Sequence, residues 1–312
     1  MKNFNKTRFG SYGKWDLAIN KGMYKNATII IICLFLGVTI LGFLISATST
    51  HAFSPSDPVV SAMMFRTATV NVFSWMSKIF TWSMIIMSGY LFHNMLTKQG
   101  RIMELTVPAT AQEKYCWHVL INIFGTMALC LICIEVCDAI YALLSLCVIG
   151  SDAVMSFWSI IVNPTNLITG MVAGKINFNG MSPEDIDIIK SAIGEFTPLI
   201  RIAWIAEINR IFFLTGVFAI VNSIKYKNNI PVTILILIIL VIALVIALIP
   251  VMAFAFSHLY ETGPEVLVPE IMHNILYIVY VLFGTEALAG IICWIMSWKN
   301  FKKAQLVNSF NK

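Results

Sequence analysis

Apolar residues lie along this chain in long runs that are separated by short polar segments. A membrane-spanning helix needs about 20 predominantly apolar residues, and six runs reach that length. They are Thr28–Ser49, Thr69–Phe92, Val119–Ile149, Ile200–Asn222, Pro231–Phe256 and Ile271–Trp298. The pattern predicts an all-α protein in which residues 28–298 form a bundle of six transmembrane helices. We expect the first run to be a retained anchor, because it is longer than the core of a signal peptide.

The composition changes this picture little. Of the 312 residues, 58% are hydrophobic and only 12% are charged, whereas soluble domains carry about 25% charged residues. A surface so poor in charge favours the lipid bilayer as the surroundings of the chain. We expect no nucleic acid among its partners.

The distribution of basic residues predicts the orientation. Lys and Arg gather before the first run, between the second and third, between the fourth and fifth, and after the sixth. Basic loops stay in the cytoplasm, so both termini are expected there. Residues 1–27 would be a basic cytoplasmic or interfacial segment, and residues 299–312 a basic cytoplasmic tail. Within the first segment, Lys14–Asn26 is either a short helix in the membrane interface or part of a solvated tail.

The largest connection outside the membrane is residues 150–199, which we predict on the extracytoplasmic side. Its first part, residues 153–174, is apolar but contains Asn163-Pro164, and we interpret it as interfacial or re-entrant. Its second part begins Ser182-Pro183-Glu184-Asp185, which is typical of a helix start. This loop is a candidate surface for binding a partner.

Charged residues also occur inside the predicted spans. Lys78, Asp138 and Arg210 each lie roughly 10 residues from the outer end of a span, about 15 Å deep at helical rise. Glu135 and Glu207 lie about one helical turn away from that level. An unpaired charge in hydrocarbon is costly, which leaves two interpretations open. Either these groups form an ion-pair network that locks the second, third and fourth spans together, or they line a path for a substrate or a proton.

Two further features of the spans carry possible chemistry. Glu286 has no residue of opposite charge in its own span, which makes it a candidate functional acid. The spacing Cys130-x-x-Cys133-x-x-x-Cys137 puts three thiols on one face of a helix. Such thiols can bind a soft metal, but cysteine is also used as a small apolar residue, and we expect no metal site. No nucleotide-binding or nucleophile motif is present, so we expect neither a catalytic residue nor an enzyme.

A polar island, residues 98–114, lies between the second and third runs, where the chain can contact a soluble partner. Its sequence is Lys98-Gln-Gly-Arg-Ile-Met-Glu-Leu-Thr-Val-Pro108-Ala-Thr-Ala-Gln-Glu113-Lys114. Thr110 followed three residues later by Glu113 is the pattern of a capping box, in which the two side chains cap the start of a helix. An ordinary loop that only sets topology is the alternative interpretation of the island.

Residues 98–118 resemble the cytoplasmic loop between the second and third spans of type-2 ABC transporter permeases, in a variant found in Bacteroidota. Such loops carry a glycine, a short amphipathic stretch with an acid, a proline, a hydroxyl residue two positions later and a glutamate. The residues that match are Gly100, Ile102, Glu104, Leu105, Pro108, Thr110 and Glu113.

The resemblance implies a membrane permease subunit of an ABC exporter in the bacterial cytoplasmic (inner) membrane. Such a subunit works as a homodimer or with a related permease, and a separate ATP-binding subunit holds the ATP and Mg²⁺. This chain would then bind no cofactor itself. A short rigid coupling helix with exposed charge, centred on Pro108, Thr110 and Glu113, would dock on the ATP-binding subunit and transmit its movement as a rigid-body shift. The alternative function is a membrane scaffold or assembly subunit whose loop 150–199 binds a partner.

Overall fold

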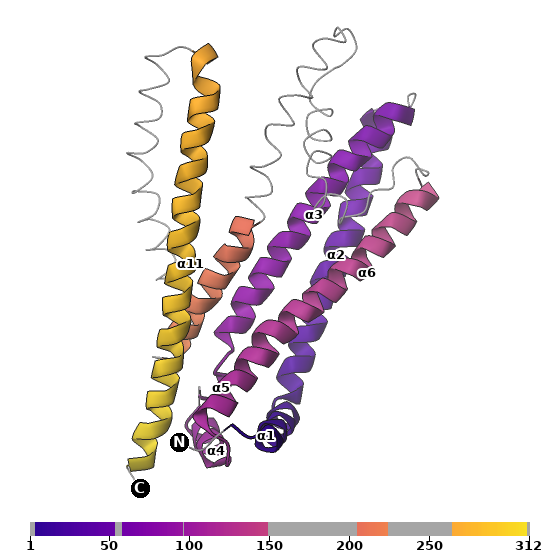
Figure 1. Ribbon diagram of the computed structural model, residues 1–312. Coiled ribbons are helices and arrows are strands. Elements are labelled where there is room, and N and C mark those ends of the chain that lie inside the picture. Colours follow the sequence, from indigo (N-terminus) through magenta and orange to yellow (C-terminus); the bar gives the residue numbers. More distant parts are fainter. Residues whose placement is uncertain (1–3, 54–57, 96, 149–204, 224–263, 311–312) are drawn as a thin grey trace. The chain divides into compact units, whose positions relative to one another are not determined.

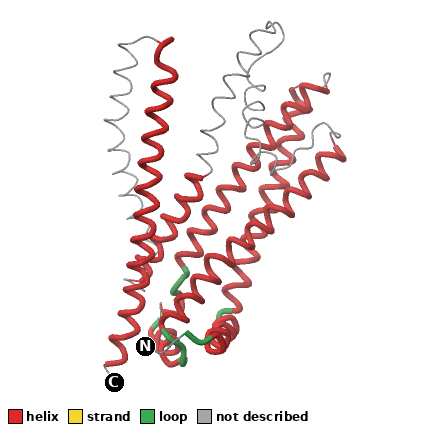
Figure 2. Tube along the Cα trace, in the orientation of Figure 1, coloured by secondary structure: helices red, strands yellow, loops and turns green. Residues whose placement is uncertain are grey.

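The computed structural model describes residues 4–53, 58–95, 97–148, 205–223 and 264–310 (Figure 1), and all regular elements among them are helical (Figure 2). The all-α prediction is therefore confirmed for this part of the chain. In chain order the elements are α1 (Lys6–Ile19), α2 (Lys21–Phe53), α3 (Pro58–Gly89), the 3-10 turn η1 (His93–Met95), α4 (Lys98–Thr106), α5 (Ala111–Val119), the π-helical segment η2 (Leu120–Gly125), α6 (Thr126–Val148), a helix over Ile205–Ser223 and α11 (Pro264–Phe310).

Among the described residues, three helical stretches are long and apolar enough to cross a membrane: Lys21–Thr48, Ala111–Cys147 and Ile205–Ser223. They correspond to the first, third and fourth predicted spans. The second and sixth predicted spans are also helical, within α3 and α11, but their place in a membrane stays a prediction. The fifth predicted span and the loop 150–199 lie outside the described residues.

Several predicted boundaries are corrected by the structure. Lys14–Asn26 is not a single helix, because α1 ends at Ile19 and α2 begins at Lys21. The helix of the second run begins at Pro58 and ends at Gly89. The long third run contains the π-helical segment η2 near its start, between α5 and α6.

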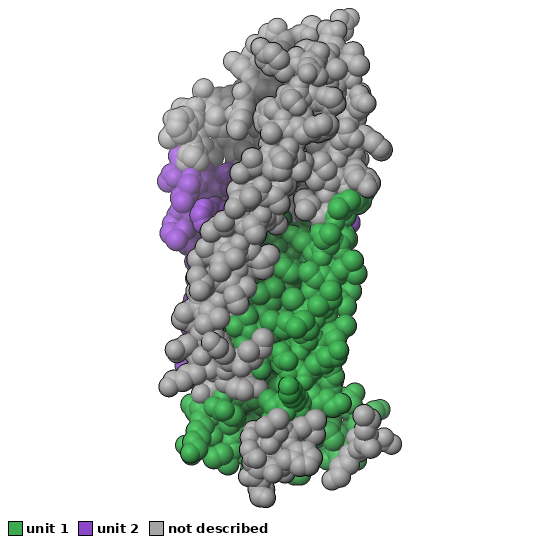
Figure 3. All heavy atoms as spheres, turned by 90° about the vertical axis from the view of Figure 1, so that its left-hand side faces the viewer, with its two compact units in different colours: residues 1–14, 85–123, 206–312 green, residues 15–84, 124–205 purple. Residues whose placement is uncertain are grey.

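The chain divides into two compact units (Figure 3). Unit 2, residues 15–84 and 124–205, has a core in which side chains of α2, α3 and α6 interlock. Phe65 stacks on Tyr141 at a centroid distance of 5.7 Å. The Tyr141 hydroxyl donates to Ser46 Oγ at 3.3 Å and accepts from Thr69 Oγ1 at 3.4 Å. One hydroxyl on α6 therefore joins two other helices.

Unit 1, residues 1–14, 85–123 and 206–312, has a core at the end where the chain turns from α3 into α4. Phe92 stacks on Phe301 of α11 with a centroid distance of 4.9 Å. Tyr115 of α5 lies edge-on to Trp298 of α11 at 5.0 Å. The Asn222 side chain donates to two carbonyl oxygens at the end of α3. These contacts fix the surroundings of α4 and α5, the helices formed by the polar island.

Candidate functional site

The first part of the polar island folds into the nine-residue helix α4, which local interactions delimit at both ends. Thr97 is the N-cap, and its hydroxyl accepts a hydrogen bond from the Gly100 amide at 3.0 Å. A Cβ atom at Gly100 would collide with the Asn94 carbonyl oxygen, so this position requires glycine. Val107 is extended, as expected for a residue before proline, and helix α4 ends before Pro108.

The second part begins α5 with the predicted capping box, which the structure confirms. Thr110 Oγ1 accepts from the Glu113 amide at 3.3 Å, and Glu113 Oε2 accepts from the Thr110 amide at 2.8 Å. Pro108 and Thr110 lie between α4 and α5. The prediction of a helix centred on Pro108, Thr110 and Glu113 is therefore wrong in its position, because these residues form the turn between two helices and the first residues of the second. The coupling function of the segment stays a prediction.

The Glu113 carboxylate does more than cap α5. Its second oxygen, Oε1, accepts hydrogen bonds from the Asn5 amide and from Arg8 Nη2, each at 2.8 Å. The Glu113 side chain is fully buried, whereas that of Arg8 is 32% exposed. A single carboxylate therefore ties the start of α5 to the N-terminal segment.

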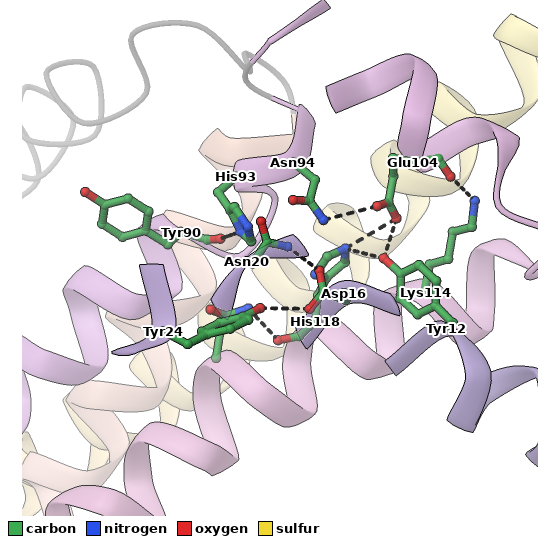
Figure 4. A network of polar contacts seen from close by, with 11 residues as sticks. Tyr12, Asp16, Asn20, Tyr24, Tyr90, His93, Asn94, Glu104, Lys114 and His118 are labelled. Carbon is green, nitrogen blue, oxygen red and sulfur yellow. Dashed lines mark hydrogen bonds and ion pairs between the residues drawn. The ribbon is translucent and has the colours of Figure 1, made fainter. Parts of the chain in front are cut away.

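A buried polar cluster surrounds the other acid of the island, Glu104 (Figure 4). Tyr12 donates to Glu104 Oε1 at 2.5 Å, and Asn94 donates to Oε2 at 3.2 Å. His118 Nε2 lies 3.5 Å from Glu104 Oε1 and 3.0 Å from the Tyr12 hydroxyl. The Lys114 ammonium donates to the Glu104 carbonyl oxygen. Tyr12, Glu104, Lys114 and His118 have at most 1% of their surface exposed.

The surroundings of Glu104 favour its charged form. Burial alone would raise the pKa of this carboxyl. The hydrogen bond and charge of His118, the hydrogen bond from Tyr12 and the charge of Lys114 outweigh burial and hold the pKa of Glu104 below its ordinary value. The cluster therefore contains a carboxylate that is stable without water around it.

The outer side of α4 has the opposite character. Ile102 and Met103 are 54% and 38% exposed, while Lys98 beside them is also exposed. From the sequence, exposed charge is expected on this segment. Lys98 supplies it, but Glu104 and Glu113 are fully buried. Helix α4 is thus held in place through the buried Glu104, and its exposed side carries Ile102, Met103 and Lys98.

The packing around α4 and α5 also involves Leu105, the remaining residue that matches the permease loops, and the N-terminal segment. Leu105 is half-buried. A Cβ atom placed on Gly13 would lie 2.5 Å from the Trp117 ring, so α1 and α5 approach closely because Gly13 has no side chain. Phe9 also meets Trp117 edge-on, with a centroid distance of 5.6 Å.

The charged residues of the predicted spans divide between the two units. In unit 1, Arg210 pairs with Glu207 of its own helix at 3.0 Å, and Glu286 accepts a hydrogen bond from Asn209 at 3.3 Å. Glu286 thus has an amide partner on a neighbouring helix, which sequence analysis did not identify. The proposed function of Glu286 as an acid stays a prediction.

In unit 2, Lys78 is exposed and lies 5.0 Å from the centroid of the Trp75 ring. Asp138 is buried and Glu135 exposed, both on α6. The predicted network across the second, third and fourth spans would connect the two units, and it stays a prediction. Cys130, Cys133 and Cys137 are buried in the core of unit 2, and in the described part of the chain no three His, Cys, Asp or Glu residues converge as metal ligands.

Sequence reasoning missed five members of the site: Asn5, Arg8, Tyr12, Asn94 and His118. The bases of the N-terminal segment are interpreted in the sequence as signals of membrane orientation. The available signal was that Glu104 and Glu113 both precede a long apolar run that begins at Val119, because an acid that becomes buried near such a run needs a hydrogen-bond donor from elsewhere in the chain.

Comparisons with protein families, with curated proteins and with solved structures find no match to this chain. The function of the chain is therefore inferred from the site itself and from the resemblance of residues 98–118.

Proposed function

We propose that this chain is the membrane permease subunit of an ABC exporter, and that a separate ATP-binding subunit docks on α4. The observation that carries the proposal is the inverted arrangement of α4, in which the acid Glu104 is buried and the apolar residues Ile102 and Met103 are exposed. A solvated surface loop has no physical reason to bury its carboxylate and expose its apolar residues. A helix that must fit into a cleft of another protein does.

The contacts that fix α4 and α5 support a role in transmitting movement from a bound partner. Glu104 ties α4 to Tyr12 and His118, and Glu113 ties the start of α5 to Arg8. A force applied to α4 would therefore reach α5 directly, and α5 continues through η2 into the long apolar helix α6. Rigid-body shifts of packed helices are a known way of transmitting such a displacement.

The resemblance of residues 98–118 to permease loops supports the same assignment. Among the matching residues, Glu104 and Glu113 are buried and would act as internal supports, whereas Ile102 is exposed. Direct contact would therefore fall to Ile102 and to the exposed residues Lys98 and Met103 of the same helix. Docking through a small apolar centre with a polar rim is typical of protein interfaces.

Co-purification from intact membranes tests the proposal. A tagged full-length chain should bring down an ATP-binding protein whose ATPase activity changes on association. Replacing both Ile102 and Met103 by Ser should abolish this association. The matched control is Leu146→Ser, which changes an apolar residue of similar exposure at the far end of α6.

Two results would overturn the assignment. One is that no ATP-binding protein accompanies the chain under conditions that preserve the membrane. The other is that the Ile102/Met103 variant, while still folded, associates as well as the Leu146 control. The second result would indicate that the exposed apolar pair contacts lipid at the membrane surface instead of a protein.

A further inference from the structure

Helix α11 carries one exposed stripe whose chemistry changes along its length. The apolar members, Leu288, Ile291, Ile292, Ile295 and Met296, are 46–62% exposed. They follow each other at intervals of three and four residues, so they share one face of the helix. The same intervals continue to three further exposed residues, Lys299, Lys302 and Lys303. The stripe therefore changes from apolar to basic between Met296 and Lys299.

The opposite face of α11 is packed against other elements of unit 1, and this packing fixes the direction in which the stripe points. Ser297 is fully buried and donates to the Ala219 carbonyl oxygen at 3.0 Å. Phe301 is fully buried against Phe92. These contacts alternate in sequence with the lysines, so the lysines cannot turn inward while the helix keeps its packing.

We propose that Lys299, Lys302 and Lys303 form a binding site for the headgroups of anionic phospholipids. The inference takes α11 as a membrane helix, as its sequence predicts, and it needs no ATP-binding subunit. The main observation is that the exposed apolar residues and the three lysines lie on one continuous face of α11. If Leu288–Met296 contact acyl chains, the next residues on that face lie at the level of the lipid phosphates.

Two details favour lipid headgroups over water alone as the surroundings of these three lysines. Trp298 lies at the change from apolar to basic, and tryptophan is enriched at membrane interfaces. In the described part of the chain, none of the three lysines forms an ion pair. Three exposed ammonium groups on one face attract negatively charged groups, and each lysine near an anionic membrane surface contributes about 1 kcal/mol of attraction.

Photocrosslinking can measure this site specifically. The full-length protein is reconstituted in vesicles of equal parts phosphatidylcholine and phosphatidylglycerol that contain a trace of either lipid with a photoreactive headgroup. Crosslinks are then mapped to the α11 peptide by mass spectrometry. We expect phosphatidylglycerol to crosslink there at least fivefold more than phosphatidylcholine, since one lysine near an anionic surface contributes about fivefold, or about 1 kcal/mol.

Variants distinguish binding at these three lysines from an effect of the protein's total positive charge. Replacing Lys299, Lys302 and Lys303 by Gln should remove the preference, and replacing all three by Arg should keep it. Replacing the exposed residues Lys6, Lys14 and Lys98 by Gln removes the same charge elsewhere and should leave the preference intact. Added salt should weaken it by screening, whereas millimolar inorganic phosphate at constant ionic strength should not compete.

The outcomes decide the inference. It is overturned if the unchanged protein shows no preference at this peptide, if the Gln variant retains the preference, or if the control variant loses as much as the site variant. Elution volume and thermal midpoint in detergent show whether each variant is folded. A failure of the ATP-binding subunit to co-purify would leave all these expectations unchanged.

Discussion

Replacing Glu104 by Gln tests whether the buried polar cluster holds α4 in place. Glutamine keeps the shape of the side chain but removes its charge. In the structure the carboxylate accepts from Tyr12 and Asn94, lies 3.5 Å from His118 Nε2 and is next to the buried Lys114. The amide can replace only part of this. Its NH₂ group would meet another donor, and Lys114 would lose the favourable charge of Glu104.

The expected loss of stability follows from these contacts. A hydrogen bond to a charged group contributes about 1.5–3 kcal/mol, and removing one partner of a buried pair costs about 3–5 kcal/mol. Because Gln still accepts from Tyr12, we expect Glu104→Gln to lower the free energy of unfolding by about 2–4 kcal/mol. At about 2–4 °C per kcal/mol, the thermal midpoint in detergent should fall by about 5–15 °C.

Fluorescence-detected thermal unfolding of the purified full-length protein measures this change. Lys98→Gln removes an exposed charge from the same helix and is the control, with an expected change within about 0.5 kcal/mol. If Glu104→Gln unfolds at the same temperature as Lys98→Gln, then the buried cluster does not stabilise the protein, and α4 is not held in place by the contacts of Glu104.

The dependence on pH adds a second check on Glu104. Its pKa is lowered in the folded protein from an ordinary value of 4.5. A carboxyl with a depressed pKa contributes its full stabilisation above that ordinary value and loses it as the pH falls through the folded pKa. The gap in midpoint between the unchanged protein and Glu104→Gln should therefore be steady from pH 7 to about pH 5 and shrink below pH 4.5. A gap that persists undiminished in acid would contradict this account.

Three further changes test other contacts. A double-mutant cycle of Arg8→Gln and Glu113→Gln, read by thermal unfolding, should give a coupling of about 0.5–1.5 kcal/mol, since Arg8 is partly exposed; additive effects would show that the pair is not formed. Gly13→Ala should destabilise by about 1–3 kcal/mol because the new methyl group overlaps Trp117, and Trp117→Leu should relieve it. Tyr141→Phe should lower the free energy of unfolding by about 0.6 kcal/mol and at most about 1.7 kcal/mol, the mean and maximum measured for hydrogen bonds between membrane helices, and an unchanged midpoint would show that this hydroxyl does not join the helices.

Local chemistry made part of the site predictable from sequence. The capping box of Thr110 and Glu113 depends on residues three positions apart, and it forms as predicted. The helical class follows from long apolar runs, and the described helices agree with it. The ends of α4 also have local causes, in the Thr97 cap and in Pro108.

The burial of Glu104 and Glu113 could not be predicted in the same way. Their donors come from Asn5, Arg8 and Tyr12, in a segment that carries no strong periodicity. Nothing local distinguishes a glutamate that faces water from one that receives a distant hydroxyl. The same limit applied to Glu286, whose amide partner belongs to another helix. In each case the charge was visible in sequence, but its partner was set by packing.

The hydrogen bonds from the N-terminal segment to Glu104 and Glu113 join residues 92 to 108 positions apart. At about 5–20 residues per second, a ribosome makes Tyr12 roughly 5–20 s before Glu104. The helices α2 and α3 are made in that interval. Tyr12 and Arg8 must therefore wait without their acceptors until both helices have left the ribosome. The cluster can therefore close only after α2 and α3 have been made, and a chain that stops before residue 94 would lack Glu104 and Glu113, the acceptors of these hydrogen bonds.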